Sequence, residues 1–281
     1  MAEIVLTMGV PHTPLLWRTL REPVPTDLEG VAANFSRFRS LLKGARPDVL
    51  VVVGSDHLRS IMTSNMPAFL IGKATEIRGT LPSEKRAFGL PASIVPGHRD
   101  LAAHLMGGSQ LPPGFDFSFS DEPWLDHSFM IPLLLLTPKL DIPIVPIHTN
   151  TNAPPIPRAL RFRALGTYLR EAIAAWPGNE RVALIGTGHL SFELGGPRQF
   201  SGMSLDPEFD DFVLDCFASG DADRLVAFAT YERMLSAGNL TFQFLNFITC
   251  LSASGDARAP IAEATPSRFG SEPFLAWGGD R

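Results

Sequence analysis

Short, continuously apolar runs are the feature that most constrains how this chain of 281 residues can fold. They occupy residues 3–10, 48–56, 68–72, 142–148 and 181–188. Most of these runs do not alternate apolar and polar residues, and uninterrupted runs are typical of strands that are covered on both faces. The pattern therefore predicts a central sheet with helices on both of its sides.

Helical patterns lie between and after these strands. They cover residues 27–45, 158–176, 207–220, 221–238 and 242–253. The alternation of strands and helices predicts an α/β fold, with a central, mostly parallel or mixed sheet flanked by helices. A chain of this length with 45% hydrophobic residues can bury one large core. We therefore interpret residues 1–281 as a single domain.

Two connections, residues 73–97 and 108–124, are rich in proline and glycine and exceed ordinary loop length. Loops of that size in a compact domain usually cover a functional site or are disordered. The sequence leaves both alternatives open for these two segments.

Charge and composition argue against several classes of protein. The net charge is −5, and the 24 basic and 29 acidic residues are interspersed, which argues against nucleic acid as a partner. The apolar run at residues 130–138 is too short to cross a bilayer, and the N-terminus lacks a basic leader. We expect a cytoplasmic protein with no membrane partner. Cys216 and Cys250 lie in apolar helical patterns and are expected to be buried free thiols.

Four of the seven histidines, His12, His57, His148 and His189, stand at or just beyond the end of a predicted strand. Ligands of open α/β sheets bind at this edge, because the loops that follow the strands converge there. The placement indicates a functional cleft. A structural explanation also exists for His12, since a histidine between two prolines can simply fill a turn.

The other histidines differ in their surroundings. The neighbour of His57 is Asp56, and a carboxylate beside an imidazole is a common arrangement around metal ligands. His127 directly follows Asp126, which suits the start of a helix. His98 and His104 fit the start of an amphipathic helix, where we expect a solvent-facing pair.

Five short motifs in a fixed order carry a family resemblance. They are GVPHTPLL (9–16), VVVGSDH (51–57), DHSFMIPL (126–133), IGTGHLS (185–191) and AGNLTFQFLNF (237–247). Together they resemble the landmarks of class III extradiol ring-cleavage dioxygenases, of the protocatechuate 4,5-dioxygenase catalytic-subunit type. The resemblance covers roughly residues 3 to 250.

The resemblance implies a ferrous iron, Fe(II), held by two histidines and one glutamate. His12 and His57 match the histidine ligands, and such a set leaves coordination positions open for a catecholate and for dioxygen. The glutamate position holds Gln243, whose amide oxygen can bind iron but carries no charge. We expect His12, His57 and Gln243 as ligands, with a nearby acid, Glu193 or Glu232, as the alternative to Gln243.

The resemblance also implies two catalytic histidines. His127 matches a histidine that contacts the substrate hydroxyl or the oxygen. The histidine that the family has in the late-strand motif is replaced by Phe192, and His189, three residues earlier, is our candidate for the base. An imidazole suits proton transfer because its ordinary pKa of about 6.5 lies close to working pH.

The implied activity is extradiol cleavage of a catechol-like aromatic by Fe(II) and O2, with carboxylated and N-heterocyclic rings among the substrates considered. Arg59 and Arg198 are candidates for binding a substrate carboxylate, although a loop arginine is more often a solvated charge. The family type implies a homodimer or a partner subunit.

Two alternatives stay open from the sequence. The first is a noncatalytic paralogous subunit that keeps the fold and pairs with an active subunit. Gln243 and Phe192 favour this alternative. The histidines suited to metal binding, His12, His57 and His127, argue against it. The second alternative is an enzyme of the same fold that acts on a hydroxypyridone or an aminophenol.

Overall fold

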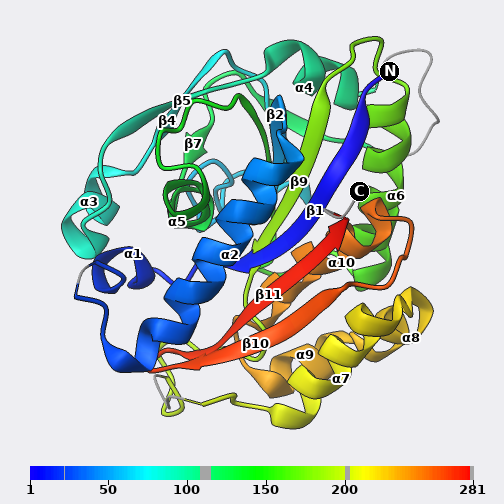
Figure 1. Ribbon diagram of the computed structural model, residues 1–281. Coiled ribbons are helices and arrows are strands. Elements are labelled where there is room, and N and C mark those ends of the chain that lie inside the picture. The colour runs from blue at the N-terminus through cyan, green and yellow to red at the C-terminus, as the bar shows by residue number, and fades with distance from the viewer. Residues whose placement is uncertain (22, 108–114, 200–202, 279–281) are drawn as a thin grey trace.

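The computed structural model describes residues 1–21, 23–107, 115–199 and 203–278. Within these ranges, an eight-stranded mixed sheet with the order β10-β11-β1-β9-β2-β8-β3-β6 is flanked by helices (Figure 1). This architecture confirms the expected α/β class. That the whole chain forms one domain stays a prediction.

The five expected strands are present, and each lies within two residues of its expected bounds. They are β1 (Glu3–Pro11), β2 (Val49–Ser55), β3 (Phe69–Gly72), β8 (Ile144–Thr149) and β9 (Arg181–Gly188). β1, β9, β2 and β8 run parallel to one another, whereas β3 is antiparallel to β8. The C-terminal ends of the four parallel strands therefore meet at one edge of the sheet.

Helices cover both faces of this sheet, and each face has its own apolar core. α2 (Glu29–Ala45) and α5 (His127–Leu136) pack on one face, where α2 lies in front of the strands in Figure 1. α6 (Ala159–Ala174) and α10 (Leu245–Ala253) pack against each other on the opposite face. The remaining α-helices are α1 (Leu16–Thr19), α3 (Pro82–Phe88), α4 (Arg99–Leu105), α7 (Pro207–Ser219), α8 (Ala222–Phe228) and α9 (Tyr231–Ala237).

A C-terminal hairpin extends the sheet beyond the strands that the sequence predicts. β10 (Ile261–Ser267) and β11 (Gly270–Gly278) pair with each other, and β11 pairs antiparallel with β1. β10 is only partly buried along most of its length. Such an edge strand lacks the continuous apolar pattern that identifies the central strands.

The connection at 73–97 is structured, so disorder does not describe it. It contains β4 (Glu76–Gly79), α3 and β5 (Ser93–Pro96), and β4 also pairs with β7 (Trp124–Leu125) in a second, three-stranded sheet. In the connection at 108–124, residues 108–114 lie outside the described residues, and Ser118–Ser120 form the edge strand β6. The first connection brings α3 to the functional edge of the main sheet.

The two cysteines are buried and free, as expected. The expectation of a solvent-facing histidine pair on α4 is wrong. His98 caps the helix, and His104 Nε2 lies 2.8 Å from the carbonyl oxygen of Ala172, because α4 packs on α6 and both rings contact Trp176. None of the helices in the described ranges combines the length and the apolar character that a membrane span requires.

Candidate metal centre and active site

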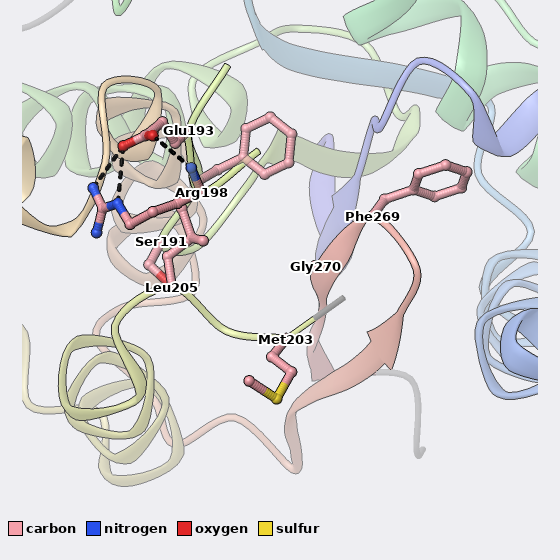
Figure 2. A pocket seen from close by; sticks show the side chains of 8 residues that line it. Ser191, Glu193, Arg198, Met203, Leu205, Phe269 and Gly270 are labelled. Carbon is pink, nitrogen blue, oxygen red and sulfur yellow. Dashed lines mark hydrogen bonds and ion pairs between the residues drawn. The ribbon is translucent and has the colours of Figure 1, made fainter. Parts of the chain in front are cut away.

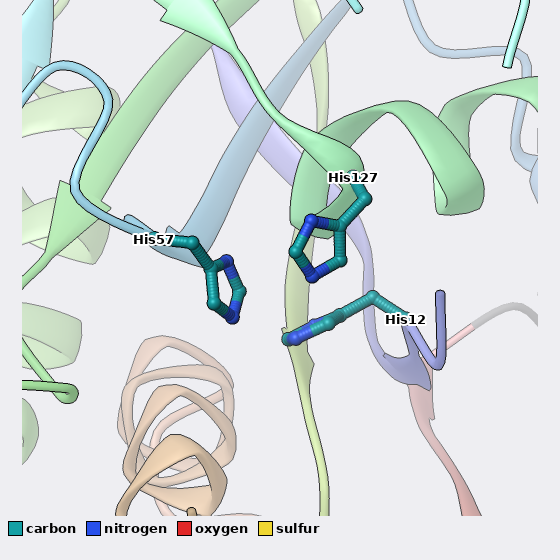
Figure 3. A group of neighbouring side chains, drawn as sticks. All are labelled: His12, His57 and His127. Carbon is teal, nitrogen blue, oxygen red and sulfur yellow. The ribbon is translucent and has the colours of Figure 1, made fainter. Parts of the chain in front are cut away.

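Three histidines converge at the C-terminal edge of the parallel strands. His12 follows β1, His57 follows β2, and His127 opens α5 (Figure 3). One ring nitrogen from each residue lies within 4.8 Å of the others. Imidazole nitrogens that face one another in this way are suitable ligands for a divalent transition metal. The buried group can therefore bind a metal ion.

His12 is held in a neutral form. Its Nδ1 lies 3.1 Å from the hydroxyl oxygen of Thr187 on β9, and its Nε2 is buried without a hydrogen-bond partner among the described residues. Burial, together with the nearby imidazoles of His189 and His57, lowers the pKa of His12. A neutral imidazole with one free, buried nitrogen is the form that binds metals.

The turn that carries His12 is anchored from the C-terminal hairpin. The hydroxyl of Thr13 donates to the carboxyl group of Glu272 on β11, at 2.8 Å from Oε2. Glu272 is buried, and burial raises its pKa to about 7. The expected rigid turn is therefore fixed by a contact between opposite ends of the chain, in addition to its prolines.

His57 is oriented by Asp126, which caps α5. The Asp126 carboxylate accepts from the backbone nitrogen of His57 at 2.8 Å and contacts its Nδ1 at 3.1 Å. Burial opposes the charged form of His57, but the charge and hydrogen bond of Asp126 outweigh it and raise the pKa of His57. The Nδ1 proton therefore faces Asp126, which leaves Nε2 as the nitrogen available for binding.

The carboxylate expected beside the His57 ring, that of Asp56, has a different role. It accepts from the backbone nitrogens of Arg59, Ser60 and Ile61, so it shapes the loop that follows His57. It also contacts Nδ1 of His148 at 3.1 Å, and the His148 ring is buried against Phe129. The structure thus places His148 beneath the loop, at Asp56.

His127 contacts a second buried carboxylate, that of Glu84 on α3. Glu84 Oε1 accepts from the backbone nitrogen of His127 at 3.1 Å and lies 2.7 Å from its Nδ1. Burial and the neighbouring His57 nevertheless lower the pKa of His127. Sequence analysis missed Glu84, because nothing in the local pattern of residues 82–88 distinguishes it from a solvated helical glutamate.

Gln243 reaches the same place from the 3₁₀ turn Thr241–Phe244. Its Nε2 lies 3.1 Å from Nε2 of His57 and 2.9 Å from Oδ1 of Asn152. Its Oε1 is buried and has no hydrogen-bond partner among the described residues. The structure thus brings the residue in the glutamate position directly beside a predicted ligand.

A close backbone approach determines the path of the chain into this turn. Gly238 has φ of 148°, and a Cβ atom there would lie 2.2 Å from the carbonyl oxygen of Phe192. Only glycine fits such a contact. The glycine of the fifth motif, Gly238, is therefore required by the structure. It allows the backbone to pass close to Phe192, and this path brings Gln243 to the site.

His189 also reaches the cluster, although Phe192 occupies the family's histidine position. The centroid of its ring lies 4.4 Å from that of His12, and the ring stacks on Phe192 at 4.3 Å with an angle of 17° between the planes. Burial and the imidazoles of His57 and His127 lower the pKa of His189 to about 3. His189 is therefore neutral at pH 7.

The acids considered as alternatives to Gln243 are not part of the cluster. Glu193 forms an ion pair with Arg198, 2.7 Å between Oε2 and Nη2 (Figure 2), and Glu232 is exposed on α9. The described residues that form the metal-binding group are histidines. Arg198 is occupied by the same ion pair, while Arg59 is exposed on the loop after His57.

The donor set fits a divalent cation. Two buried ligand atoms, His12 Nε2 and Gln243 Oε1, have no partner, and the Nε2 of His57 lies beside Gln243. Buried polar atoms are rarely left unpaired, because each unpaired atom destabilises the fold by about 1–3 kcal/mol. Asp126 and Glu84 add two buried carboxyl groups next to His57 and His127.

Comparison with known proteins finds sequence similarity to dioxygenases. A protein 30% identical over 228 residues is the 2,3-dihydroxyphenylpropionate/2,3-dihydroxicinnamic acid 1,2-dioxygenase of Rhodococcus jostii, and the alignment covers 81% of this chain and 67% of that one. A protein of the same name from a Rhodococcus species is 26% identical, with 87% of each chain covered. The gallate dioxygenase of Pseudomonas putida is 35% identical over 133 residues, which are 45% of this chain and 39% of that one.

One solved structure and one family model extend this similarity to nearly the whole chain. The crystal structure of an uncharacterized Escherichia coli K12 protein has the same fold, with a TM-score of 0.61, 18% identity and coverage of 98% of this chain and 100% of that one. Residues 6–277 match the model of the family described as the catalytic LigB subunit of aromatic ring-opening dioxygenase. The chain therefore belongs to the LigB family of aromatic ring-opening dioxygenases.

Proposed function

We propose that the protein is an Fe(II)-dependent extradiol dioxygenase that opens a catechol-type ring and transfers both atoms of O2 to the product. The observation that carries this proposal is the presence of two buried, unpartnered ligand atoms, His12 Nε2 and Gln243 Oε1, on two side chains that both lie close to His57. Family membership makes ring opening by O2 the chemistry to which such a centre is suited.

His12, His57 and Gln243 are the residues that would hold the iron. Bound Fe(II) would supply a binding position for the two substrate oxygens and a path for electron density from the ring to dioxygen. Gln243 adds no charge, so the negative charge next to the ligands comes from the Asp126 carboxylate at His57. The substrate adds a further negative charge when one of its hydroxyl groups loses its proton.

Two histidines of the chain are our candidates for catalytic residues. His189 is neutral, lies against His12 and is our candidate for the base that takes the proton from the substrate hydroxyl. His127 is the candidate for the group that contacts the substrate hydroxyl or the oxygen through Nε2, because its Nδ1 faces the carboxylate of Glu84. Phe192 is stacked behind His189 and keeps water from that side of the ring.

The relatives suggest the class of substrate. Their names specify dihydroxyphenylpropionate, dihydroxycinnamate and gallate, which combine adjacent hydroxyl groups with a carboxylate. We propose a carboxylated catechol for this chain. Arg59, exposed two residues after His57, is the candidate for pairing with the carboxylate, because Arg198 is already paired with Glu193.

A second candidate function is that of a noncatalytic subunit that pairs with an active one. The observation that favours it is the loss of two family residues, with Gln243 in the glutamate position and Phe192 in a histidine position. The assembly as a homodimer or with a partner subunit, and the cytoplasmic location, stay predictions.

Anaerobic Fe(II) binding followed by oxygen uptake tests the proposal. We expect one iron per chain in the wild type, none in His57→Ala, and one in the control His104→Ala, whose ring contacts α6 far from the cluster. With 2,3-dihydroxyphenylpropionate as the probe, we expect uptake of one O2 per substrate. Iron binding without uptake on any catechol, aminophenol or hydroxypyridone would favour the noncatalytic subunit, and full turnover by His127→Ala would contradict the role of His127.

A further inference from the structure

The amide of Gln243 has a donor end and an acceptor end, and its neighbour Asn152 decides which end faces which group. Asn152 lies in the loop after β8, and its Nδ2 donates to the carbonyl oxygen of Asp56 at 2.8 Å. A carbonyl oxygen only accepts, so the amino end of Asn152 must face Asp56. Its Oδ1 therefore faces Gln243.

The same argument then fixes the orientation of Gln243. Oδ1 of Asn152 also only accepts, so the atom of Gln243 that lies 2.9 Å away must be the donor Nε2. The free end of the amide is consequently Oε1, which is buried and without a partner among the described residues. This neutral oxygen, on a side chain that contacts His57, is therefore available to bind a cation.

We propose that Asn152 is a positioning residue that reserves the amide oxygen of Gln243 for the metal and thereby lets a neutral side chain serve where the family has glutamate. This inference rests on the proposed function, since it assumes that the site binds a metal. In this role Asn152 acts on the metal through Gln243, and its bond to Asp56 fixes the orientation of its own amide.

The pairing is specific to glutamine. A glutamate at position 243 would place an acceptor against Oδ1 of Asn152, and turning the Asn152 amide around would place Oδ1 against the Asp56 carbonyl oxygen. One unfavourable contact would remain in either case. Asn152 and Gln243 therefore form a matched pair.

An opposite role for Gln243 is also testable. Its Nε2 lies 3.1 Å from Nε2 of His57 and can donate to the nitrogen that a metal needs. If that bond dominated, the amide would compete with the metal, and His127 would be the third ligand beside His12 and His57. Removal of the amide distinguishes the two roles, because it weakens metal binding in the first and tightens it in the second.

The experiment is a measurement of anaerobic Fe(II) affinity by competition with a chelator, for the wild type, Asn152→Leu, Gln243→Leu and the double variant. We expect Asn152→Leu to bind about tenfold more weakly, which is within the range for loss of a group that orients a ligand. Gln243→Leu should bind at least as weakly, and the double variant no more weakly than Gln243→Leu. This non-additivity is the signature of a residue that acts through Gln243.

Asn150→Ala is the matched control, because Asn150 lies in the same loop and its side chain bonds to the backbone of that loop, at Ala153 and Pro155. Asn150→Ala should change the Fe(II) affinity by the same factor in the wild type and in Gln243→Leu. Circular dichroism verifies that each variant folds, and Asn152→Ala replaces the leucine variant if the latter does not.

The outcomes separate this inference from the proposed function. Affinity of Asn152→Leu equal to that of the wild type, multiplicative losses in the double variant, or tighter binding by Gln243→Leu would each overturn the role of Asn152. If the wild type still binds iron and His57→Ala does not, the proposed metal centre remains supported even when the role of Asn152 is overturned. An absence of iron binding in the wild type would overturn both.

Discussion

Glu84 accepts two hydrogen bonds from His127, one from the backbone nitrogen at 3.1 Å and one from ring Nδ1 at 2.7 Å. The first fixes where α5 begins, and the second fixes the tautomer of the ring, with Nε2 turned to the cluster. Glu84 belongs to the long connection at 73–97, so that segment contributes a side chain to the candidate site.

Glu84→Gln should lower turnover without removing the metal. The amide oxygen can still accept from Nδ1, but a neutral acceptor makes Nε2 of the imidazole less basic than a carboxylate does. We expect kcat to fall by about tenfold or more, while the iron content stays at that of the wild type. Glu76→Gln, at an exposed glutamate on β4, is the control. An unchanged kcat in Glu84→Gln would show that His127 does not need this partner.

Gln243→Glu should make the fold dependent on metal. Without a cation, a buried carboxylate faces the acceptor Oδ1 of Asn152, which should lower the free energy of unfolding by about 1–3 kcal/mol. A bound cation pairs with the new charge and stabilises the folded state by mass action. The rise in melting temperature on adding Fe(II) should therefore exceed that of the wild type, and equal shifts would contradict the prediction.

Gly238→Ala should destabilise the protein. A Cβ atom would lie 2.2 Å from the carbonyl oxygen of Phe192, at a backbone conformation with φ of 148°. We expect a loss of about 2 kcal/mol or more in chemical denaturation, together with weaker iron binding because the turn that carries Gln243 moves. Gly44→Ala, on the exposed side of α2 where nothing lies within 4 Å, is the control and should stabilise the helix slightly.

Glu272 should make stability depend on pH. Its pKa rises from 4.5 to about 7 on burial, so between these values the folded state holds a proton that the unfolded state has lost. The free energy of unfolding should therefore fall as pH rises through this window, by up to about 3 kcal/mol.

Glu272→Gln tests this dependence. The variant stays neutral, and its amide oxygen can still accept from Thr13 and Ser267. Urea denaturation at pH 5 and pH 8 should show that the variant loses less stability than the wild type between the two values. Parallel losses in both proteins would show that another group is responsible.

The central strands and most helices could be predicted from sequence because burial on both faces leaves a continuous apolar run, as in residues 48–56. The hairpin of β10 and β11 could not be predicted, because it is stabilised by pairing with β1, a partner more than 250 residues away.

Long-range contacts also limit what the sequence predicts about the site. His12, His57, His127 and His189 were identifiable from motifs, and the structure does bring them together with Gln243.

The residues that orient these side chains were not identifiable. Glu84 and Asn152 act through long-range hydrogen bonds to His127 and Gln243, and their local sequences are those of an ordinary helix and an ordinary loop. A periodic pattern records burial, but no pattern records which distant group an individual carboxylate or amide contacts.

The positions of the site residues along the chain bear on when the site can form during folding. His57 and Gln243 are 186 residues apart, and His12 and its partner Thr187 are 175 apart. Contacts of such sequence separation form late, since each closes a long loop at an entropic cost. A ribosome-bound chain therefore cannot assemble the centre before residue 243 has emerged, and uptake of metal during refolding would report the last steps of folding.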